Sequence, residues 1–510
     1  MDRLTQMHGW LDQVTVSDEI PIVNILMISL SPGEAFAGQT TAVAAGFQIA
    51  VAAQRSLRFV LLRDDVVGSV PSASEVSTWV RSLAPATFQG EVSVIYGPQL
   101  NSLHVSAEDL WVATHWMTAS TLNHFLKGRE LPASRAVYVI QDFEPAFSPW
   151  SSSYAIAEST YNHGFIPMVN SSSLADFLED QGHVDFARSY CFSPDVNSDA
   201  LRQASAEWTK DPEGKIRVLF YGRPAHPRNL FEIGVESLRT WVALVEEDEV
   251  QQLTVVSAGT EHEPIDLGRG VTMTSLGKTS LGAYYKLLSK TDMALALMHS
   301  PHPGHLPLEL PMSGIPTVTN SLGTYRKEWV SRLRVTRPNV DDISRELRSA
   351  YNTALNLSEH KYEALQDGAL GAPLITAAER VTKIALSSAV TDLPTEIHDK
   401  NSSAHLIAEY RSLAAFRAER ITSLNRKLVT MEKGSQFSKK VIGAPKIDEL
   451  RIKILETEIR RLKDRIQIQR RQLRRLNKLK SFRIVQALLP LMRRALAIRR
   501  QLRFRLQKNF

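Results

Sequence analysis

Two cationic side chains follow apolar runs in the second part of the sequence, where they could meet a phosphate group. Arg223 comes after a run that ends at Tyr221, and Lys278 follows a Leu-Gly pair after a second run. Cations at strand ends on one side of a sheet suit a nucleotide diphosphate, because they neutralise the charge that grows on the departing β-phosphate. We therefore expect Arg223 and Lys278 to form a diphosphate site with a catalytic role.

A proline- and histidine-rich loop, residues 300–309, precedes an expected helix that opens near Leu306. Backbone N–H groups at a helix start can face a diphosphate, and Glu309 in the first turn can accept hydrogen bonds from ribose hydroxyls. Any one of these residues fits an ordinary surface charge or turn equally well. Their joint occurrence in this order favours a nucleotide site.

The first part of the sequence offers carboxylates instead. Asp142 and Glu144 follow an expected strand at 137–140 and are candidates for binding sugar hydroxyls or accepting a proton. Glu144 could instead shape a turn before the next proline. His115, after the strand at 110–114, is a possible sugar or acceptor contact, although a satisfied structural histidine fits its position at least as well.

A glycine loop that includes Gly33 and Gly38 follows the first expected strand. It lacks the spacing of dinucleotide-binding loops. Its glycines can still let the backbone approach a ligand at a helix N-terminus. By itself the loop identifies no ligand.

Alternating strands and helices must position these residues. The first half is predicted to contain strands at 23–30, 58–62, 91–96, 110–114, 137–140 and 166–169, with helices at 40–53 and 173–178. The second half is predicted to contain strands at 216–221, 253–258, 293–297 and 317–319, with helices at 229–246, 281–288, from 306, 341–355 and 377–389. Such alternation predicts an α/β fold of two doubly wound parallel sheets with ligand at the strand ends between them.

The expected domains are an acceptor-side unit at 1–195 and a nucleotide-sugar-binding unit at 213–395, joined by a polar linker at 193–215. With 510 residues, one cysteine, no run of about 20 apolar residues and no signal-peptide pattern, the sequence predicts a soluble intracellular protein without disulfides. No aspartate–x–aspartate pair is evident at a strand end, so we expect no metal and no cofactor.

The last part of the chain is strongly basic. Residues 401–510 hold 29 Lys and Arg against 8 Asp and Glu, a net charge of +21, whereas the rest carries −15. Heptad spacing at 401–480 predicts a parallel coiled coil that forms a homodimer, or a single helix docked on its own body. An apolar face beside arginines at 481–510 suits a peripheral helix, or two helices broken at Pro490, on the anionic inner face of the plasma membrane.

Several short segments together resemble one family. They are Gln141-Asp142-Phe143-Glu144-Pro145-Ala146-Phe147, Tyr221-Gly222-Arg223-Pro224, Arg228-Asn229, Leu276-Gly277-Lys278, Ser300-Pro301-His302-Pro303, Pro307-Leu308-Glu309, Ser313-Gly314 and Thr319-Asn320. The chain, over about 23–386, resembles GT-B glycosyltransferases of family 4, specifically the WsaF-like rhamnosyltransferases that use dTDP-β-L-rhamnose.

The resemblance implies that Arg223 and Lys278 clamp the diphosphate, Glu309 holds the ribose, and Asp142 lies near the transferred sugar or the acceptor. It also implies a wider set of donor-binding residues and a possible contact through Gln141. The donor set is Gly38, Tyr221, Arg223, Arg228, Asn229, Lys278, His302, His305, Leu308, Glu309 and Asn320. Two positions depart from the family pattern: Pro301 replaces a glutamate of most family 4 enzymes, and His305 replaces a tyrosine of the subgroup.

The sequence therefore predicts a metal-independent, retaining glycosyltransferase that adds a deoxyhexose to a surface polysaccharide or lipid-linked glycan. The alternatives are the same fold with a UDP- or GDP-sugar, and a non-catalytic basic coiled-coil scaffold or nucleic-acid-binding protein. Retention, thymidine and rhamnose follow from the resemblance alone.

Overall fold

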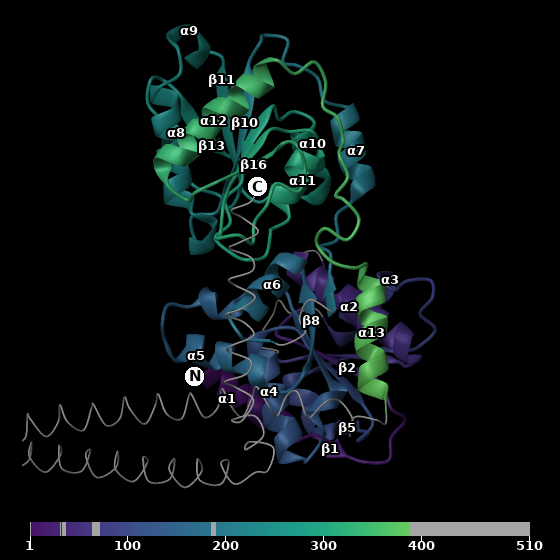
Figure 1. Cartoon of the computed structure of the whole chain (residues 1–510). Coiled ribbons are helices and arrows are strands. Elements are labelled where there is room, and N and C mark those ends of the chain that lie inside the picture. The colour runs from purple at the N-terminus through teal and green to yellow at the C-terminus, as the bar shows by residue number, and fades with distance from the viewer. Residues whose placement is uncertain (1, 31, 33–36, 64–71, 185–189, 388–510) are drawn as a thin grey trace, which may run out of the picture. The chain divides into compact units, whose positions relative to one another are not determined.

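The computed structural model describes residues 2–30, 32, 37–63, 72–184 and 190–387. The predicted coiled coil at 401–480, the basic segment at 481–510 and residues 33–36 of the glycine loop lie outside these described residues. Both sheets belong to one unit that ends at Ser387 (Figure 1).

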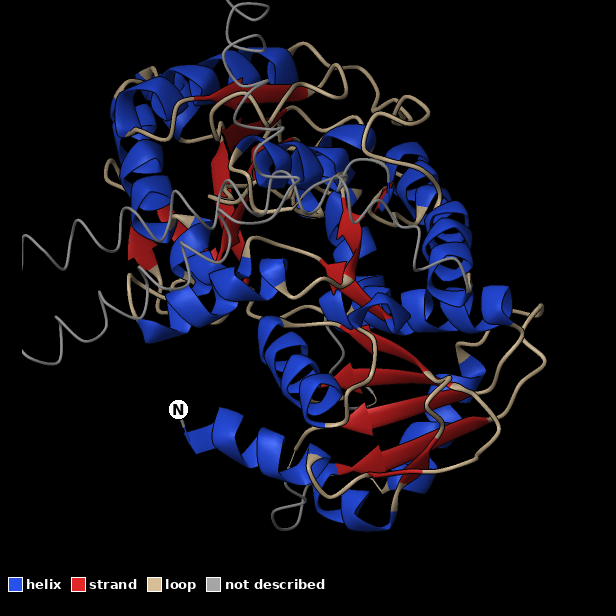
Figure 2. Cartoon of the chain, turned by 60° about the horizontal axis from the view of Figure 1, so that its bottom comes forward, coloured by secondary structure: helices blue, strands red, loops and turns tan. Residues whose placement is uncertain are grey.

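The first sheet is parallel and has the strand order β4-β3-β2-β6-β7-β8-β9. Its strands are β2 (Val23–Met27), β3 (Leu57–Leu61), β4 (Val92–Tyr96), β6 (Leu110–Ala113), β7 (Ala136–Ile140), β8 (Ile166–Asn170) and β9 (Cys191–Phe192). The order reverses between β2 and β6, as in a Rossmann-like sheet. Figure 2 shows these strands side by side between layers of helices. A two-stranded sheet, β1 (Thr15–Val16) with β5 (His104–Val105), accompanies it.

Helices cover both faces of the first sheet because its strands are apolar on both sides. In β2, Ile25 packs into one core cluster and Leu26 into another. The α-helices of this domain are α1 (Asp2–Leu11), α2 (Ala37–Ala53), α3 (Ala73–Ser82), α4 (Trp116–Gly128), α5 (Ser152–Ser159) and α6 (Ser172–Asp180). Short 3-10 helices are η1 (Gly97–Ser102), η2 (Ala133–Arg135), η3 (Glu144–Phe147) and η4 (Thr160–Asn162).

The second sheet has the order β12-β13-β11-β10-β14-β15-β16, with only β12 antiparallel to its neighbour. Its strands are β10 (Ile216–Gly222), β11 (Leu253–Gly259), β12 (Ile265–Asp266), β13 (Thr272–Ser275), β14 (Met293–Leu295), β15 (Thr317–Asn320) and β16 (Leu333–Thr336). Its helices are α8 (Phe231–Ala243), α9 (Glu247–Val250), α10 (Leu281–Leu288), α11 (Leu306–Met312), α12 (Val340–Leu355) and the 3-10 helix η6 (Pro227–Asn229). The expectation of two doubly wound α/β units is confirmed.

The segment at 193–215, expected to be a polar linker, contains a packed helix instead. Helix α7 (Ser198–Ala206) buries Leu201 and Ala204 against the core of the second domain. Trp208 is also buried, and its indole N–H donates to Asp292 at 2.9 Å. The polar composition of the segment concealed a helix that presents only one narrow apolar face.

The last described helix corrects a second expectation. Helix α13 (Leu374–Leu386) was expected to complete the second domain, but it packs against α2 of the first (Figure 1). Its buried residues, including Ala377 and Val381, belong to the core cluster that contains β2 and β3. Just before it, Ser193 donates its N–H to the carbonyl of Ala372 at 2.9 Å, beside β9. The chain therefore returns to the first sheet before residue 387.

Candidate active site

The carboxyl edge of the second sheet carries Arg223, directly after β10. Its guanidinium donates to the Tyr221 hydroxyl at 3.3 Å and to His226 Nε2 at 2.5 Å. His226 accepts in its neutral form, because burial and then the charges of Arg223 and Arg228 lower the pKa of His226. Arg223 is thus held at the strand end by two uncharged groups, and its own charge is not neutralised by either.

Lys278 lies at the same edge, just after β13, and β13 and β10 flank β11. Gly277 adopts a left-handed φ of 60°, which glycine tolerates best. The Gly277 carbonyl accepts from the Gly259 N–H at 2.9 Å, and the Leu276 N–H donates to Ser257 at 2.7 Å. These bonds fix the loop before Lys278 to the end of β11, while the Lys278 side chain is exposed. The structure therefore places both predicted diphosphate cations at one sheet edge.

Glu309 lies in α11 and is nearly buried. Its Oε2 accepts a hydrogen bond from the Tyr284 hydroxyl at 2.8 Å, and its Oε1 lies 3.8 Å from His305 Nδ1. Burial, followed by the charge of Glu309, raises the pKa of Tyr284 well above its ordinary value, so the phenol remains a donor. Tyr284 thus orients the carboxylate and leaves Oε1 on the side of His305, where it can accept from a hydroxyl.

In the first turn of α11, two of the N–H groups that were expected to face a diphosphate instead donate within the protein. The N–H groups of Leu308 and Glu309 both donate to the carbonyl of His305, at 3.0 and 2.8 Å. The Leu308 side chain is fully buried in the core of the second domain. Leu308 therefore packs in the core that carries the site. It was expected to contact the ligand, and its burial corrects that expectation.

His302 is a buried donor in the loop before α11. Its Nδ1 accepts from the Gly304 N–H at 3.0 Å, so the ring carries its proton on Nε2. Burial and the positive surroundings of His305, Arg326 and Arg228 lower the pKa of His302 well below its ordinary value. Among the described residues this Nε2 has no hydrogen-bond partner. A buried, unpaired N–H suits the oxygen of a phosphate or sugar.

Asn229 and Asn320, both expected to contact the nucleotide, are fully buried. Asn229 donates to the Leu297 carbonyl at 3.2 Å, and Asn320 pairs with the backbone N–H and carbonyl of Met298 at 2.7 and 3.0 Å. Both amides therefore hold the segment after β14, which leads into the loop of His302.

Arg326 is a residue of this site that the sequence did not reveal. Its buried guanidinium donates to the carbonyls of Ser300 and His302 at 3.0 and 3.1 Å, and to the Asn320 carbonyl at 3.2 Å. Burial lowers the pKa of Arg326 to about 10, which leaves it charged at neutral pH. In the sequence it is one charge among many in a polar segment, and nothing local signals that it is buried.

Asp142 lies after β7 and connects the two domains. Its carboxylate accepts from Arg228 at 2.6 Å, from the Ser300 hydroxyl, and from the Phe143 N–H at 2.8 Å. Arg228 and Ser300 belong to the second domain, where Arg228 lies in η6 and Ser300 in the loop of His302. The structure thus brings Asp142 and Arg228 together, two residues predicted separately.

Glu144 is buried and has different partners. One oxygen accepts from the Trp116 N–H, at the start of α4, and from the Tyr138 hydroxyl at 3.0 Å. Burial raises the pKa of Glu144 to about 8, although both hydrogen bonds act in the opposite direction. This geometry favours a positioning role, in which Glu144 joins α4 to β7, over direct contact with substrate.

Of the remaining predicted contacts, His115 is the N-cap of α4. Its Nδ1 accepts from the Met117 N–H at 3.2 Å, and burial lowers the pKa of His115 to about 4. Gln141 donates to the Gly38 carbonyl at 2.9 Å and so joins the start of α2 to the end of β7. His115 is therefore a neutral helix cap, whereas Gln141 and Gly38 lie together beside Asp142.

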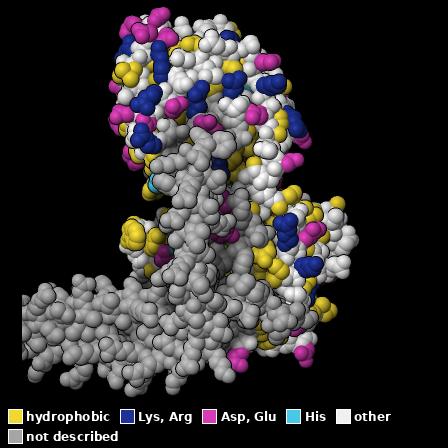
Figure 3. Space-filling model, in the orientation of Figure 1, with side chains coloured by type: hydrophobic (Ala, Val, Ile, Leu, Met, Phe, Trp, Pro, Cys, Tyr) yellow, Lys and Arg dark blue, Asp and Glu magenta, His cyan; other side chains and the backbone are white. Residues whose placement is uncertain are grey.

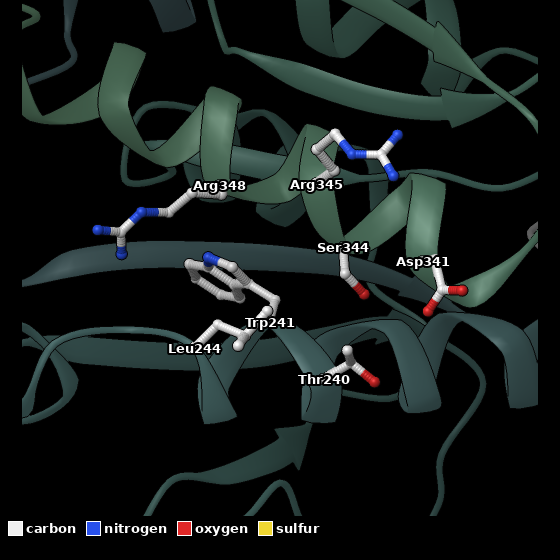
Figure 4. Close-up of a pocket in the computed structure, with 7 residues that line it drawn as sticks. All are labelled: Thr240, Trp241, Leu244, Asp341, Ser344, Arg345 and Arg348. Carbon is white, nitrogen blue, oxygen red and sulfur yellow. The ribbon is translucent and has the colours of Figure 1, made fainter.

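A cavity of about 390 Å³ lies elsewhere in the second domain, between α8 and α12. Figure 4 shows Trp241 and Leu244 on one wall and Arg345 and Arg348 on the other. Both arginines are already ion-paired, Arg345 with Asp342 at 2.9 Å and Arg348 with Glu249 at 3.0 Å. In the same domain, acidic and basic side chains are interspersed over the face seen in Figure 3. The predicted site residues do not line this cavity.

Two known domain families match the chain, one over each Rossmann-like domain. The WsaF N-terminal domain matches residues 22–172, and the WsaF C-terminal domain matches residues 216–348. A curated relative, the O-antigen biosynthesis protein RfbC of Myxococcus xanthus, is 29% identical over 315 residues. That alignment covers 61% of this chain but only 22% of the relative.

Solved structures resemble the chain more distantly. HepE of Anabaena in complex with UDP is 14% identical with a TM-score of 0.45, over 75% of this chain and 100% of that one. WaaG, a glycosyltransferase of lipopolysaccharide biosynthesis, is 14% identical with a TM-score of 0.39, over 74% and 99% of the two chains.

Proposed function

The chain belongs to the WsaF family of glycosyltransferases, and from this premise we propose that it transfers L-rhamnose from dTDP-β-L-rhamnose to a growing cell-surface polysaccharide or lipid-linked glycan. The observation that carries the proposal is the placement of Arg223 and Lys278 at one edge of the second sheet, the edge where Rossmann-like sheets bind ligands. The O-antigen description of the Myxococcus relative supports a surface polysaccharide as the product.

The donor site would use four side chains in distinct roles. Arg223 and Lys278 bind the diphosphate, and His302 donates its unpaired Nε2–H to a phosphate or sugar oxygen. Glu309, oriented by Tyr284, accepts from the ribose hydroxyls through the oxygen that lies toward His305. Two cations at one sheet edge and a buried N–H donor in the same domain are groups complementary to a diphosphate.

Transfer breaks the bond between the anomeric carbon and the β-phosphate oxygen, and the electron pair leaves with the nucleoside diphosphate. Charge grows on that oxygen in the transition state, so Arg223 and Lys278 stabilise the transition state more than the ground state. The acceptor hydroxyl oxygen forms the new bond to the anomeric carbon, and its proton passes to the departing phosphate oxygen. The proposal also includes retention of configuration, transfer without a metal ion, and a place for Asp142 near the sugar or acceptor.

Assays with a panel of nucleotide sugars test the donor assignment. Purified full-length protein is incubated with dTDP-rhamnose and with UDP- and GDP-hexoses, and release of free nucleotide is measured. We expect the fastest release from dTDP-rhamnose. Faster release from a UDP- or GDP-sugar would reassign the donor, and no release from any sugar nucleotide would contradict the proposed activity.

The basic part of the sequence adds a proposal on location. Residues 401–510 carry a net charge of +21, and we propose that they hold a homodimer of the enzyme at the anionic inner face of the plasma membrane, beside a lipid-linked acceptor. Among the helices of the described residues, none is long and apolar enough to span a bilayer.

A further inference from the structure

An exposed aromatic surface lies beside Asp142, between η3 and the first turn of α5. It consists of Phe147, Trp150 and Tyr154, which we call the aromatic platform. The Trp150 side chain is 90% exposed and that of Phe147 45%. Contiguous exposed apolar side chains with polar neighbours commonly mark a binding site.

The platform is held in place from below. The indole of Trp150 stacks on the ring of Tyr154, with centroids 5.2 Å apart and planes 14° apart. Tyr154 in turn packs edge-on against Phe143, at 6.3 Å and 76°, and Phe143 is buried in the core of the first domain. Ser151 caps α5 by accepting from the Tyr154 N–H at 3.3 Å. Trp150 therefore presents one ring face to solvent while a column of aromatic rings supports the other.

The platform is also joined to the candidate active site. Phe143, at the base of the column, is the residue directly after Asp142. The guanidinium carbon of Arg228 lies 4.6 Å from the centroid of the Phe147 ring, and the same guanidinium pairs with Asp142 at 2.6 Å. A ligand lying on the aromatic rings would therefore extend toward Asp142.

We propose that the aromatic platform binds the neutral pyranose rings of the glycan acceptor, with Trp150 as the main contact. The C–H groups on one face of a pyranose carry partial positive charge and match the negative face of an indole. Serines at 148, 151, 152 and 153 offer hydroxyls for the sugar, and no charged residue occurs between 145 and 157. This inference rests on the proposed glycosyltransferase function and assigns its acceptor subsite.

The charges around the platform favour a neutral saccharide over an anionic membrane as its binding partner. Binding to an anionic leaflet draws on Lys and Arg near the inserted rings. Here Arg228, the cation that lies against Phe147, is already paired with Asp142. The first charged residue after Trp150 along the chain is Glu158, one turn beyond Tyr154 on the same helix. A negative charge at this place disfavours an anionic lipid surface and is compatible with a neutral saccharide.

Saturation-transfer NMR on the full-length protein tests the platform directly. The probes are short neutral rhamno-, manno-, gluco- and galacto-oligosaccharides, and the readout is saturation passed from protein aromatic protons to sugar ring protons. Loss of one aromatic stacking contact is worth about a factor of ten in affinity. We expect Trp150→Ala to weaken binding of the best saccharide by about that factor, and Trp150→Phe to restore most of it. Ile20→Ala is the matched control, since Ile20 is 85% exposed and lies before β2, at the opposite edge of the first sheet.

Three outcomes would overturn the inference. They are equal saturation transfer in Trp150→Ala and the parent, no saccharide contact in any variant, and a Trp150→Ala defect confined to co-sedimentation with phosphatidylglycerol vesicles. The rise in melting temperature on adding dTDP reports the donor site independently. If the parent shows this rise without saccharide contact, the platform assignment fails while the proposed function stands. If dTDP has no effect and no sugar nucleotide is cleaved, the proposed function fails.

Discussion

At the scale of single residues, the two predicted diphosphate cations are held differently. Arg223 is fixed by Tyr221 and His226, whereas the Lys278 side chain is exposed after a loop fixed by backbone hydrogen bonds. Neither side chain is buried in a hydrophobic core. Their removal should therefore affect chemistry far more than folding.

We predict that Arg223→Ala and Lys278→Ala each reduce turnover by on the order of 10²-fold, because each removes a positive charge that stabilises the developing anion. Thermal unfolding should change little. Lys290→Ala is the control, since Lys290 is exposed and precedes β14, at the opposite edge of the sheet. Near-normal turnover in both variants would contradict the proposal that Arg223 and Lys278 bind the diphosphate.

The raised pKa of Glu144 predicts a pH dependence of stability. The folded pKa is about 8 and the unfolded value is near the ordinary 4.5, so the native state binds the extra proton between these two values. The contribution is complete below the lower value and is lost as pH rises through about 8. Glu144→Gln mimics the protonated side chain, so its melting temperature should decline less than that of the parent over this range. If the melting temperatures of the two proteins change with pH in parallel, the raised pKa of Glu144 is contradicted.

Arg326 acts on the loop of His302 through backbone carbonyls. Arg326→Met keeps the length of the apolar stem but leaves the carbonyls of Ser300, His302 and Asn320 without this donor. Each buried acceptor left unpaired costs about 1–3 kcal/mol. We expect a lower melting temperature together with a raised KM for the donor. A stability loss with an unchanged donor KM would show that Arg326 does not position the donor site.

At the scale of elements, the backbone path from the second sheet to α13 requires a glycine at position 371. Gly371 has a φ of 131°, and a Cβ at this position would lie 2.6 Å from the carbonyl carbon of Phe192. The neighbouring Ala372 accepts from the Ser193 N–H, so the backbones cannot move apart without loss of that bond. This close approach allows α13 to reach the first sheet.

Gly371→Ala should therefore destabilise the protein by about 1–3 kcal/mol, because alanine avoids this backbone conformation and its methyl group meets main chain. Gly128→Ala is the control, since Gly128 ends α4 with no atom close enough to meet a Cβ. Denaturant unfolding measures both. Equal stability of the two variants would show that the backbone at Gly371 relaxes.

At the scale of the whole molecule, the charge is divided along the chain. Residues before 401 carry a net charge of −15 and those from 401 onward +21. The basic segment at 481–510 includes Arg483, Arg493 and Arg494 among apolar side chains. Each cation near an anionic surface adds about 1 kcal/mol of attraction, and salt screens it.

Deletion of residues 481–510 should abolish co-sedimentation with vesicles that contain phosphatidylglycerol, while nucleotide release from the donor continues at the parent rate. Binding by the parent should weaken as salt rises, and neutral phosphatidylcholine vesicles should bind little. Transfer to a lipid-linked acceptor should fall, whereas transfer to a soluble acceptor should not. Unchanged vesicle binding after deletion would assign the positive charge to another partner.

The sequence by itself determined the two α/β units, most of their strands, the family, and the places of Arg223 and Lys278. These follow from local patterns, because apolar runs specify buried strands and residues just after them must lie at the carboxyl edge of a parallel sheet. Tertiary structure alone decided the partners of Asp142, the burial of Arg326 and the docking of α13 on α2. It also decided that Glu144 is sequestered between Trp116 and Tyr138. Asp142 and Ser300 are 158 positions apart, and no local pattern records which side chains meet across that separation or lose their water there.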